Sequence, residues 1–268
     1  MGETMSEPER IDRIIAHPGS ILSSILKGER TERTCIKCGA KFNALWATIC
    51  EECSDKIRAG QEEADRLAAE AEAAQYLKEI TRNASIPTFW QDTRFETSVP
   101  TIHPELLEQA KKYTADFSVR SPSLLFHGKN VGAGKTHLAV CIANEVLHEK
   151  HIPVLYLKAR DMLINLRGLY TPGSETSERD YLNRVLSIPL LVLDDVGRDN
   201  PTEWTDGTYW TIFDRRLEAQ LPTIITTNKS PHDVVDNALG DRIGYPALSR
   251  LLSMCAGLVF EVGGQDLR

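Results

Sequence analysis

The sequence lacks any apolar run that approaches the roughly 20 residues of a membrane-spanning helix. Its first residues, MGETMSEPERIDRI, are acidic and polar, unlike a signal peptide. It also lacks an excess of positive charge. The net charge of the 268 residues is -7, which argues against a basic surface for duplex DNA but allows a local basic groove. We therefore expect a cytoplasmic protein without a membrane partner, in which the six cysteines are reduced thiols or metal ligands.

One stretch, LLFHGKNVGAGKTHLAV at 124–140, predicts a phosphate-binding loop. A short apolar run predicts a buried strand, a glycine-rich loop follows, and an apolar-periodic helix begins near residue 134. In this layout, backbone N–H groups of the loop and of the helix N-terminus face the β- and γ-phosphates of a nucleotide. The Lys135 ammonium would add positive charge there, and the Thr136 hydroxyl would bind Mg²⁺. The expected nucleotide contacts are Gly128, Gly132, Ala133, Gly134, Lys135, Thr136 and His137.

The glycines of this loop depart from the usual spacing, which places a glycine five residues before Gly134, where this sequence has Lys129. Gly128 lies one residue earlier. Either the loop is longer by one residue, or Gly132 makes the tight turn. A glycine-rich turn that binds nothing is the alternative, but the strand before it and the helix after it are the context that the motif requires.

A second apolar run, LLVL at 190–193, ends in two carboxylates, Asp194 and Asp195. Downstream of a phosphate-binding loop this is the Walker B position. Asp194 would hold Mg²⁺, mostly through water, and Asp195 would orient and polarise the attacking water. The next apolar run ends in Asn228, which could reach the γ-phosphate and that water if its strand lies beside the Walker B strand. Alternatively, the carboxylates cap a turn and Asn228 is an ordinary turn residue.

Four of the cysteines form two Cys-x-x-Cys pairs: Cys35, Cys38, Cys50 and Cys53. Each pair can lie on a tight turn, and four thiolates would complete a tetrahedral Zn²⁺ site. The gap of eleven residues between the pairs still allows a small ribbon, and Gly39 suits the turn after the first pair. The alternative is four free thiols. Cys141 and Cys255 lie among apolar residues and are expected to be buried side chains.

Composition divides the chain near residue 82. The segment 54–82 is rich in Ala, Glu, Lys and Gln, which predicts one long helix. We therefore expect a zinc module with a helical connector over 1–82 and an α/β domain over 83–268. In the second domain, helices alternate with strands, which predicts a parallel sheet covered on both faces. The expected strands are 123–127, 153–158, 189–194, 222–227 and 257–262, and the expected helices are 134–150, 160–168, 178–187, 205–219, 231–239 and 246–254.

Several of these stretches together resemble an AAA+ ATPase of the bacterial helicase-loader group, the DnaC/DnaI type, with IstB transposition helpers as close relatives. The resemblance covers about 83–268 and rests on IP followed by FE near residue 86, then GAGKTHLA, LLVLDDVG, FDRR, ITTN, LGDR, LSRL and GGQDLR. It implies an AAA+ P-loop NTPase whose five-stranded parallel sheet lacks a full helical lid. It also implies ATP with Mg²⁺, ATP-driven self-assembly on single-stranded DNA, and a replicative DNA helicase as partner.

The same resemblance suggests roles for three arginines. Arg250, in LSRL, matches an arginine finger that reaches the γ-phosphate held by a neighbouring subunit. Arg268 resembles the sensor-2-like arginine of the family's closing motif. Arg242, in LGDR, is a weaker candidate because extra residues at 244–246 separate it from Arg250. Each of them could instead be a solvated surface arginine.

DNA contacts are less clearly predicted. In the resembling proteins a helical insertion before the Walker B strand lines a central channel, and the matching region here is 159–187. Its Arg167, Tyr170, Arg179 and Tyr181 offer charge and stacking suited to single strands.

The leading interpretation is an ATPase that loads a replicative helicase, and the zinc module favours it because the resemblance suggests that such N-terminal modules bind the helicase. The nearest alternative is a helper of a transposase. A small-molecule kinase is a third interpretation, opposed by the paired Asp194 and Asp195 and by Arg250. A fourth is an adaptor that binds nucleotide without hydrolysing it.

Overall fold

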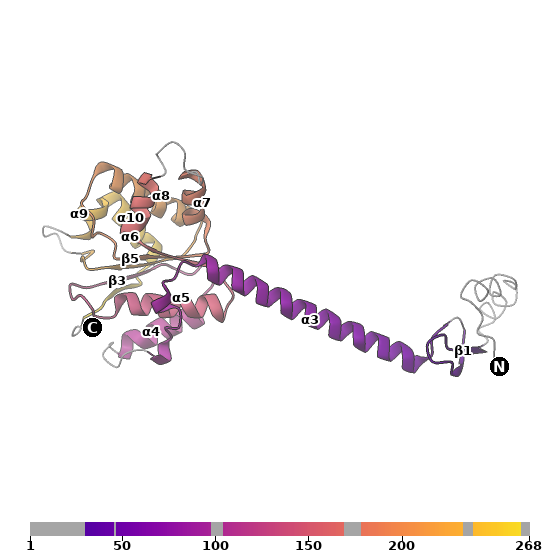
Figure 1. Cartoon of the computed structure of the whole chain (residues 1–268). Helices are drawn as coiled ribbons and strands as arrows, with labels where there is room; N and C mark the ends of the chain where they lie inside the picture. Colours follow the sequence, from indigo (N-terminus) through magenta and orange to yellow (C-terminus); the bar gives the residue numbers. More distant parts are fainter. Residues whose placement is uncertain (1–29, 46, 98–103, 169–177, 233–237, 264–268) are drawn as a thin grey trace. The chain divides into compact units, whose positions relative to one another are not determined.

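The computed structural model describes residues 30–45, 47–97, 104–168, 178–232 and 238–263 (Figure 1). The chain forms two compact units, Met1–Ala73 and Ala74–Arg268, and the division lies within helix α3 (Glu51–Asn83). None of the described helices combines the length and the apolar character that a membrane span needs.

The first unit contains a small antiparallel hairpin of β1 (Thr31–Thr34) and β2 (Lys41–Ala44), in which Thr31 is opposite Ala44. The turn between the strands closes when the Gly39 amide donates to the Cys35 carbonyl at 2.9 Å. Gly39 has a φ of +75°, a conformation that glycine adopts without steric cost. Phe42 on β2 is only half-buried, so the described hairpin has little apolar core of its own.

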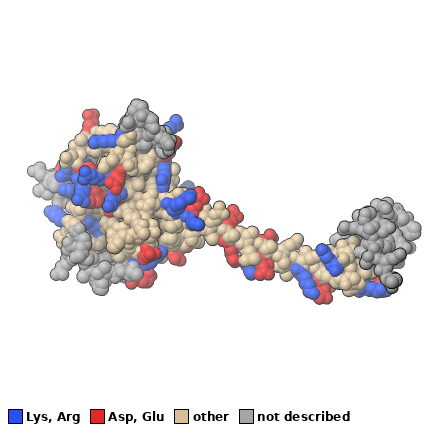
Figure 2. Space-filling view, in the orientation of Figure 1, with Lys and Arg blue, Asp and Glu red and all other residues tan. Residues whose placement is uncertain are grey.

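Helix α3 confirms the long helix expected over 54–82 and extends it at both ends. Among the described residues of this helix, Ile80 is the one that is buried. Acidic and basic side chains are interspersed along it (Figure 2), including the i,i+4 pair of Glu52 and Lys56 and the i,i+3 pair of Asp55 and Arg58. Exposed pairs of this kind stabilise a helix only slightly, and the helix-favouring composition supplies the rest.

The second unit is built on a parallel sheet with the order β4-β5-β6-β3-β7, which confirms the predicted five-stranded parallel sheet. Its strands are β3 (Leu124–His127), β4 (Val154–Lys158), β5 (Leu190–Asp194), β6 (Thr223–Thr227) and β7 (Val259–Glu261). Each lies within a residue or two of the strand expected from the apolar runs. All residues of β3, β5 and β6 are buried, as continuous apolar strands in a sheet covered on both faces should be.

Helices cover both faces of this sheet, as Figure 1 shows, with α4 and α5 on one side and α6 to α10 on the other. Alternate residues of a strand therefore enter different cores. Leu124 and Phe126 pack with α4 and α5, whereas Leu125 packs with the helices of the opposite face. The helices are α4 (Pro104–Ala115), α5 (Lys135–His148), α6 (Ala159–Gly168), α7 (Glu178–Ser187), α8 (Glu203–Glu218), α9 (Leu239–Ile243) and α10 (Tyr245–Cys255).

Three helices differ from the expectation, and one of them is the short α9, which was not predicted. Helix α4 was not predicted, although its buried Leu106, Ala110 and Thr114 follow helical spacing. The helix expected over 231–239 is wrong at residues 231, 232 and 238, which are not helical, while 233–237 lie outside the described residues. The Ser230 hydroxyl accepts the His232 amide at 3.3 Å, so Ser230 and the following proline form a turn and not a helix start.

One buried cation holds the end of this sheet together. The Arg216 side chain on α8 is fully buried, and burial lowers the pKa of its guanidinium. It donates to the carbonyls of Val185, Ile188 and Pro222 and to the Thr223 hydroxyl, at 2.7–3.0 Å. These partners belong to the segments that enter β5 and β6, so one side chain satisfies the backbone of two strand entrances.

Replacement of Arg216 by Met is expected to lower the free energy of unfolding by about 3–5 kcal/mol, because several buried carbonyls lose their donor together. The matched control is Arg215→Met, one residue earlier on the same helix, where the arginine is exposed and pairs loosely with Glu218. Its effect should stay within about 0.5 kcal/mol. Urea denaturation followed by circular dichroism measures both, and equal stability of the two variants would contradict a structural role for Arg216.

Candidate functional site

The loop between β3 and α5 has three glycines with positive φ: Gly128, Gly132 and Gly134. Gly132, at +81°, makes the tight turn inside the loop, and Gly134, at +95°, starts the helix. Gly128 is needed for a different reason, because a Cβ there would lie 2.4 Å from the Val262 carbonyl oxygen. The Val262 amide also donates to the His127 carbonyl, so the segment after β7 is held tightly against the loop. The unusual glycine spacing is thus explained by this close approach.

Lys135 and Thr136 begin helix α5, and both point into the loop region. The Lys135 ammonium donates to the carbonyls of Gly128 and Asn130 at 2.9 and 2.8 Å, which holds it across the loop. Burial lowers the pKa of Lys135, while the nearby charges of Asp195 and Asp194 oppose that shift. The arrangement keeps a cation beside the backbone amides that would bind phosphate.

The carboxylate of Asp194, at the end of β5, is buried and collects hydroxyl groups from three other elements. Its Oδ1 accepts from Thr136 at 2.7 Å and from Thr226 of β6 at 2.6 Å, and its Oδ2 accepts from Tyr156 of β4 at 2.7 Å. Burial, and next the charge of Asp194, raise the pKa of Tyr156, so this phenol stays a donor. The Thr136 and Asp194 oxygens thus lie side by side, a pair of hard ligands suited to Mg²⁺.

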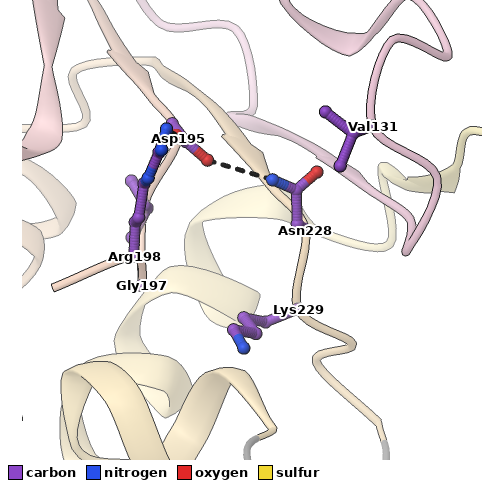
Figure 3. A pocket seen from close by; sticks show the side chains of 7 residues that line it. Val131, Asp195, Gly197, Arg198, Asn228 and Lys229 are labelled. Carbon is purple, nitrogen blue, oxygen red and sulfur yellow. Dashed lines mark hydrogen bonds and ion pairs between the residues drawn. The ribbon is translucent and has the colours of Figure 1, made fainter. Parts of the chain in front are cut away.

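Asp195 follows directly in a left-handed conformation with a φ of +61°, which turns its side chain out of the sheet. Figure 3 shows its carboxylate pointing to the Asn228 amide, and both residues line a cavity of about 320 Å³ together with Val131 and Lys229. The Asn228 amide donates to Oδ1 at 3.1 Å, and Arg198 donates to Oδ2 at 2.9 Å. Strands β5 and β6 are hydrogen-bonded neighbours, which explains why Asn228 reaches the carboxylate.

A larger cavity of about 800 Å³ joins these groups, and Lys135, Thr136, Asp194, Asp195 and Asn228 all line it. The structure therefore brings together the residues that were predicted from separate motifs. Four more predicted residues, Gly132, Ala133, Gly134 and His137, lie in the same wall, and burial lowers the pKa of His137.

Part of the wall of the large cavity is aromatic and was not predicted. Phe89 and Trp90 of the short 3-10 helix η1 (Thr88–Trp90) line it together with Thr93. The Trp90 ring lies edge-on to His137, with 6.0 Å between ring centroids. The buried Asn144 of α5 donates to the carbonyls of Trp90 and Thr93 and so fixes this segment over the helix. The aromatic pair after Pro87 was the available sequence signal for a base-binding wall.

Of the three arginines assigned by resemblance, Arg250 and Arg242 belong to the described part of the chain, and neither lines either cavity. Arg250 lies on α10 and pairs with Asp214 of α8, and Arg242 donates weakly to the Asp199 carbonyl at 3.5 Å. Arg268 lies outside the described residues. Of the candidate DNA contacts, Arg167 stacks on the Trp204 ring at 4.5 Å, Tyr181 is half-buried, Arg179 is exposed, and Tyr170 lies outside the described residues.

The four paired cysteines of the first unit form a cluster of their own. All four Sγ atoms lie within 4.8 Å of one another, and Cys38 and Cys50 are 3.7 Å apart. Tetrahedral Zn²⁺ with four thiolates at its usual bond length separates the sulfurs by about 3.8 Å, so the cluster fits this metal. The Cys50 backbone amide is the chief cause of a Cys35 pKa lowered to about 6, whereas the neighbouring Cys38 and Cys50 thiols raise that of Cys53 to about 12. A cation among them would relieve this repulsion between thiolates.

Known proteins are similar to this chain in sequence and in fold. The chain is 31% identical over 140 residues to the replicative helicase loader DnaC of Buchnera aphidicola subsp. Schizaphis graminum, which covers 52% of this chain and 55% of that protein. It is 32% identical over 116 residues to the replicative helicase loader DnaI of Bacillus subtilis, covering 43% of this chain and 36% of the relative. The chain therefore spans about half or less of the length of these curated relatives.

Among solved structures, the crystal structure of the DnaC helicase loader superimposes with a TM-score of 0.57 at 25% identity, covering 66% of this chain and all of that one. The likeness confirms the predicted α/β AAA+ P-loop fold. Residues 74–268 match the family model described as IstB-like ATP binding protein, which is more than half of the chain. The chain therefore belongs to the family of IstB-like ATP binding proteins.

Proposed function

We propose that this protein is an ATPase that loads a replicative DNA helicase onto single-stranded DNA, acting as an ATP-switched oligomer. The observation that carries the proposal is the meeting of Thr136, Asp194, Asp195 and Asn228 in one cavity beside the Lys135 loop. Nucleotide binding alone would need only the phosphate-binding loop and Lys135. The second carboxylate and the asparagine facing it are the parts suited to placing a water molecule.

Each side chain has a separate task in this proposal. Lys135 and the loop amides bind and orient the phosphates. Thr136 and Asp194 hold Mg²⁺, which supplies charge neutralisation at the phosphates when bound. Asp195 accepts a proton from the attacking water, and Asn228 orients both partners. Phe89 and Trp90 form an aromatic part of the cavity wall, which suits a purine ring.

Arg250 is the residue that supports a catalytic site shared between two subunits. It is 44% exposed on its side chain and lies outside the cavities that its own subunit forms in the described residues. An arginine that serves catalysis must then act on the nucleotide of a second copy. Such a site is complete only between subunits, which would couple ATP binding to assembly.

The helicase-loading role is supported by the relatives that carry the name replicative helicase loader. We propose that the first unit holds Zn²⁺ through Cys35, Cys38, Cys50 and Cys53 and binds the helicase, and that the assembled second units bind single-stranded DNA. This role places the protein in the cytoplasm. The family description favours a second candidate, an IstB-like helper of a transposase, which would use the same ATPase site with a different partner.

Replacement of Lys135 by Ala is expected to abolish ATP binding, whereas Asp195→Asn should keep ATP binding and slow hydrolysis at least about 100-fold. The first change removes the charge that holds the phosphates, and the second removes only the proton acceptor. Isothermal titration and a phosphate-release assay separate the two effects. Lys150→Ala, at a surface lysine that donates to the Ala115 carbonyl, is the control and should behave as wild type. Wild-type hydrolysis by Asp195→Asn would exclude a catalytic second carboxylate.

We predict one Zn²⁺ per chain, because a unit with so small an apolar core needs a metal to fold. Elemental analysis of protein purified under reducing conditions measures the stoichiometry. Cys38→Ser should lose the metal, while Cys141→Ala, at a buried cysteine of the second unit, should retain it. A metal content far below one in the wild-type protein would refute the site.

The loading role predicts that the full-length protein retains a purified replicative helicase with or without ATP, but binds a labelled single-stranded oligonucleotide tightly only with ATP. Pull-down and fluorescence anisotropy measure the two interactions, and Lys135→Ala should lose only the second. If the helicase is not retained and a transposase encoded beside the gene is, the transposase-helper function replaces the loader.

A further inference from the structure

The candidate finger Arg250 is held by one carboxylate of its own subunit. Its Nε donates to Oδ1 of Asp214 at 2.6 Å, joining α10 to α8. The Asp214 side chain is only 20% exposed, and the neighbouring Phe213 and Leu251 are fully buried in the same core. The Asp214 carboxylate is therefore fixed in position by the packed core between α8 and α10.

The contact engages the side of the guanidinium and leaves its end available. Arginine has five N–H donors, one on Nε and four on the two Nη groups. Among the described residues, the Nε bond to Asp214 is the polar contact that Arg250 makes. The two Nη groups can therefore form the paired hydrogen bonds by which arginine binds a phosphate.

We infer that Asp214 is a positioning residue: it fixes the Arg250 guanidinium through Nε so that the Nη groups point at the phosphate of a neighbouring subunit. This inference rests on the proposed action of Arg250 on a second copy. A long side chain that is free to rotate loses entropy when it meets its target, and the contact with Asp214 removes most of that loss in advance. Asp214 touches neither nucleotide nor water in this scheme, so it acts only through Arg250.

The neighbouring pair on the same helix shows what an ordinary surface ion pair looks like here. Arg215 and Glu218 are 3.7 Å apart, and both side chains are about two-thirds exposed. Asp214 and Arg250 are closer, less exposed, and join two different helices. Substitutions of Arg215 or Glu218 are matched controls, because each removes an arginine or a carboxylate from α8 without affecting α10.

The test mixes full-length variants and measures kcat for ATP hydrolysis. Asp214→Ala should lower kcat about tenfold with unchanged ATP affinity, and Asp214→Glu should recover part of the loss. Mixing Asp214→Ala with Lys135→Ala should restore activity, because the second protein supplies an intact Arg250 to the site of the first. Mixing Asp214→Ala with Arg250→Ala should restore none. A chain that carries both Asp214→Ala and Arg250→Ala should be no slower than Arg250→Ala alone. Glu218→Ala should keep the wild-type rate.

The outcomes distinguish a failure of the shared site from a failure of the positioning role of Asp214. If Arg250→Ala and Lys135→Ala fail to complement although both fold and associate, the shared site is refuted and the inference falls with it. If they complement but Asp214→Ala keeps the wild-type kcat, or is not rescued by Lys135→Ala, the inference alone is overturned. Thermal melting monitors folding. If Asp214→Ala does not fold, Asp214→Leu, which has a similar size and no acceptor for Nε, replaces it, and a wild-type kcat for that variant overturns the inference.

Discussion

The buried carboxylate of Asp194 is the constraint on which the site depends. A carboxylate taken out of water needs a donor for each oxygen, and here the donors come from α5, β4 and β6. Satisfying this one group therefore holds the phosphate-binding loop, the Walker B strand and its two neighbours in fixed positions. Tyr156 remains protonated and Thr226 also accepts the Asp195 amide, so the same network sets the direction of the second carboxylate. The geometry proposed for ATP hydrolysis follows from the satisfaction of a buried charge.

The parts of this site that were predicted are those encoded by short runs of sequence. The glycine-rich loop, the paired carboxylates and the strand before Asn228 each have a local pattern, and parallel strands bring their carboxyl ends to one edge. The aromatic wall at Trp90 was missed because a residue far away in the sequence positions it. Asn144 donates hydrogen bonds to the carbonyls of Trp90 and Thr93, which lie more than 50 residues earlier in the chain. The helix expected over 231–239 was wrong at residues 231, 232 and 238, because a serine followed by proline suits both a turn and a helix start and the local sequence does not distinguish them.

The FDRR motif shows how helical spacing divides one run of residues among different tasks. Phe213 and Arg216 are three residues apart and face inward, where one fills the core and the other satisfies the strand entrances. Asp214 lies toward α10 and holds Arg250, and Arg215 faces solvent. Residue type alone does not decide these roles: Arg216 is fully buried, Arg250 is about half-exposed, and Arg215 is exposed. Burial and partner decide them, and neither is visible in the motif.

The two units of the chain are stabilised by different physics, and this has a consequence for how they respond to ligands. The second unit has two extensive apolar cores, one on each face of its sheet. In its described part, the first has a hairpin with half-buried side chains and four clustered thiols, so a metal bound to these thiols would contribute strongly to its folding free energy. Helix α3 is polar on nearly all sides and adds little apolar burial to either unit. A chelator should therefore act on the fold of the first unit and leave the second intact, whereas nucleotide stabilises the second unit by mass action. Partner binding and ATP hydrolysis can then be altered separately in one chain.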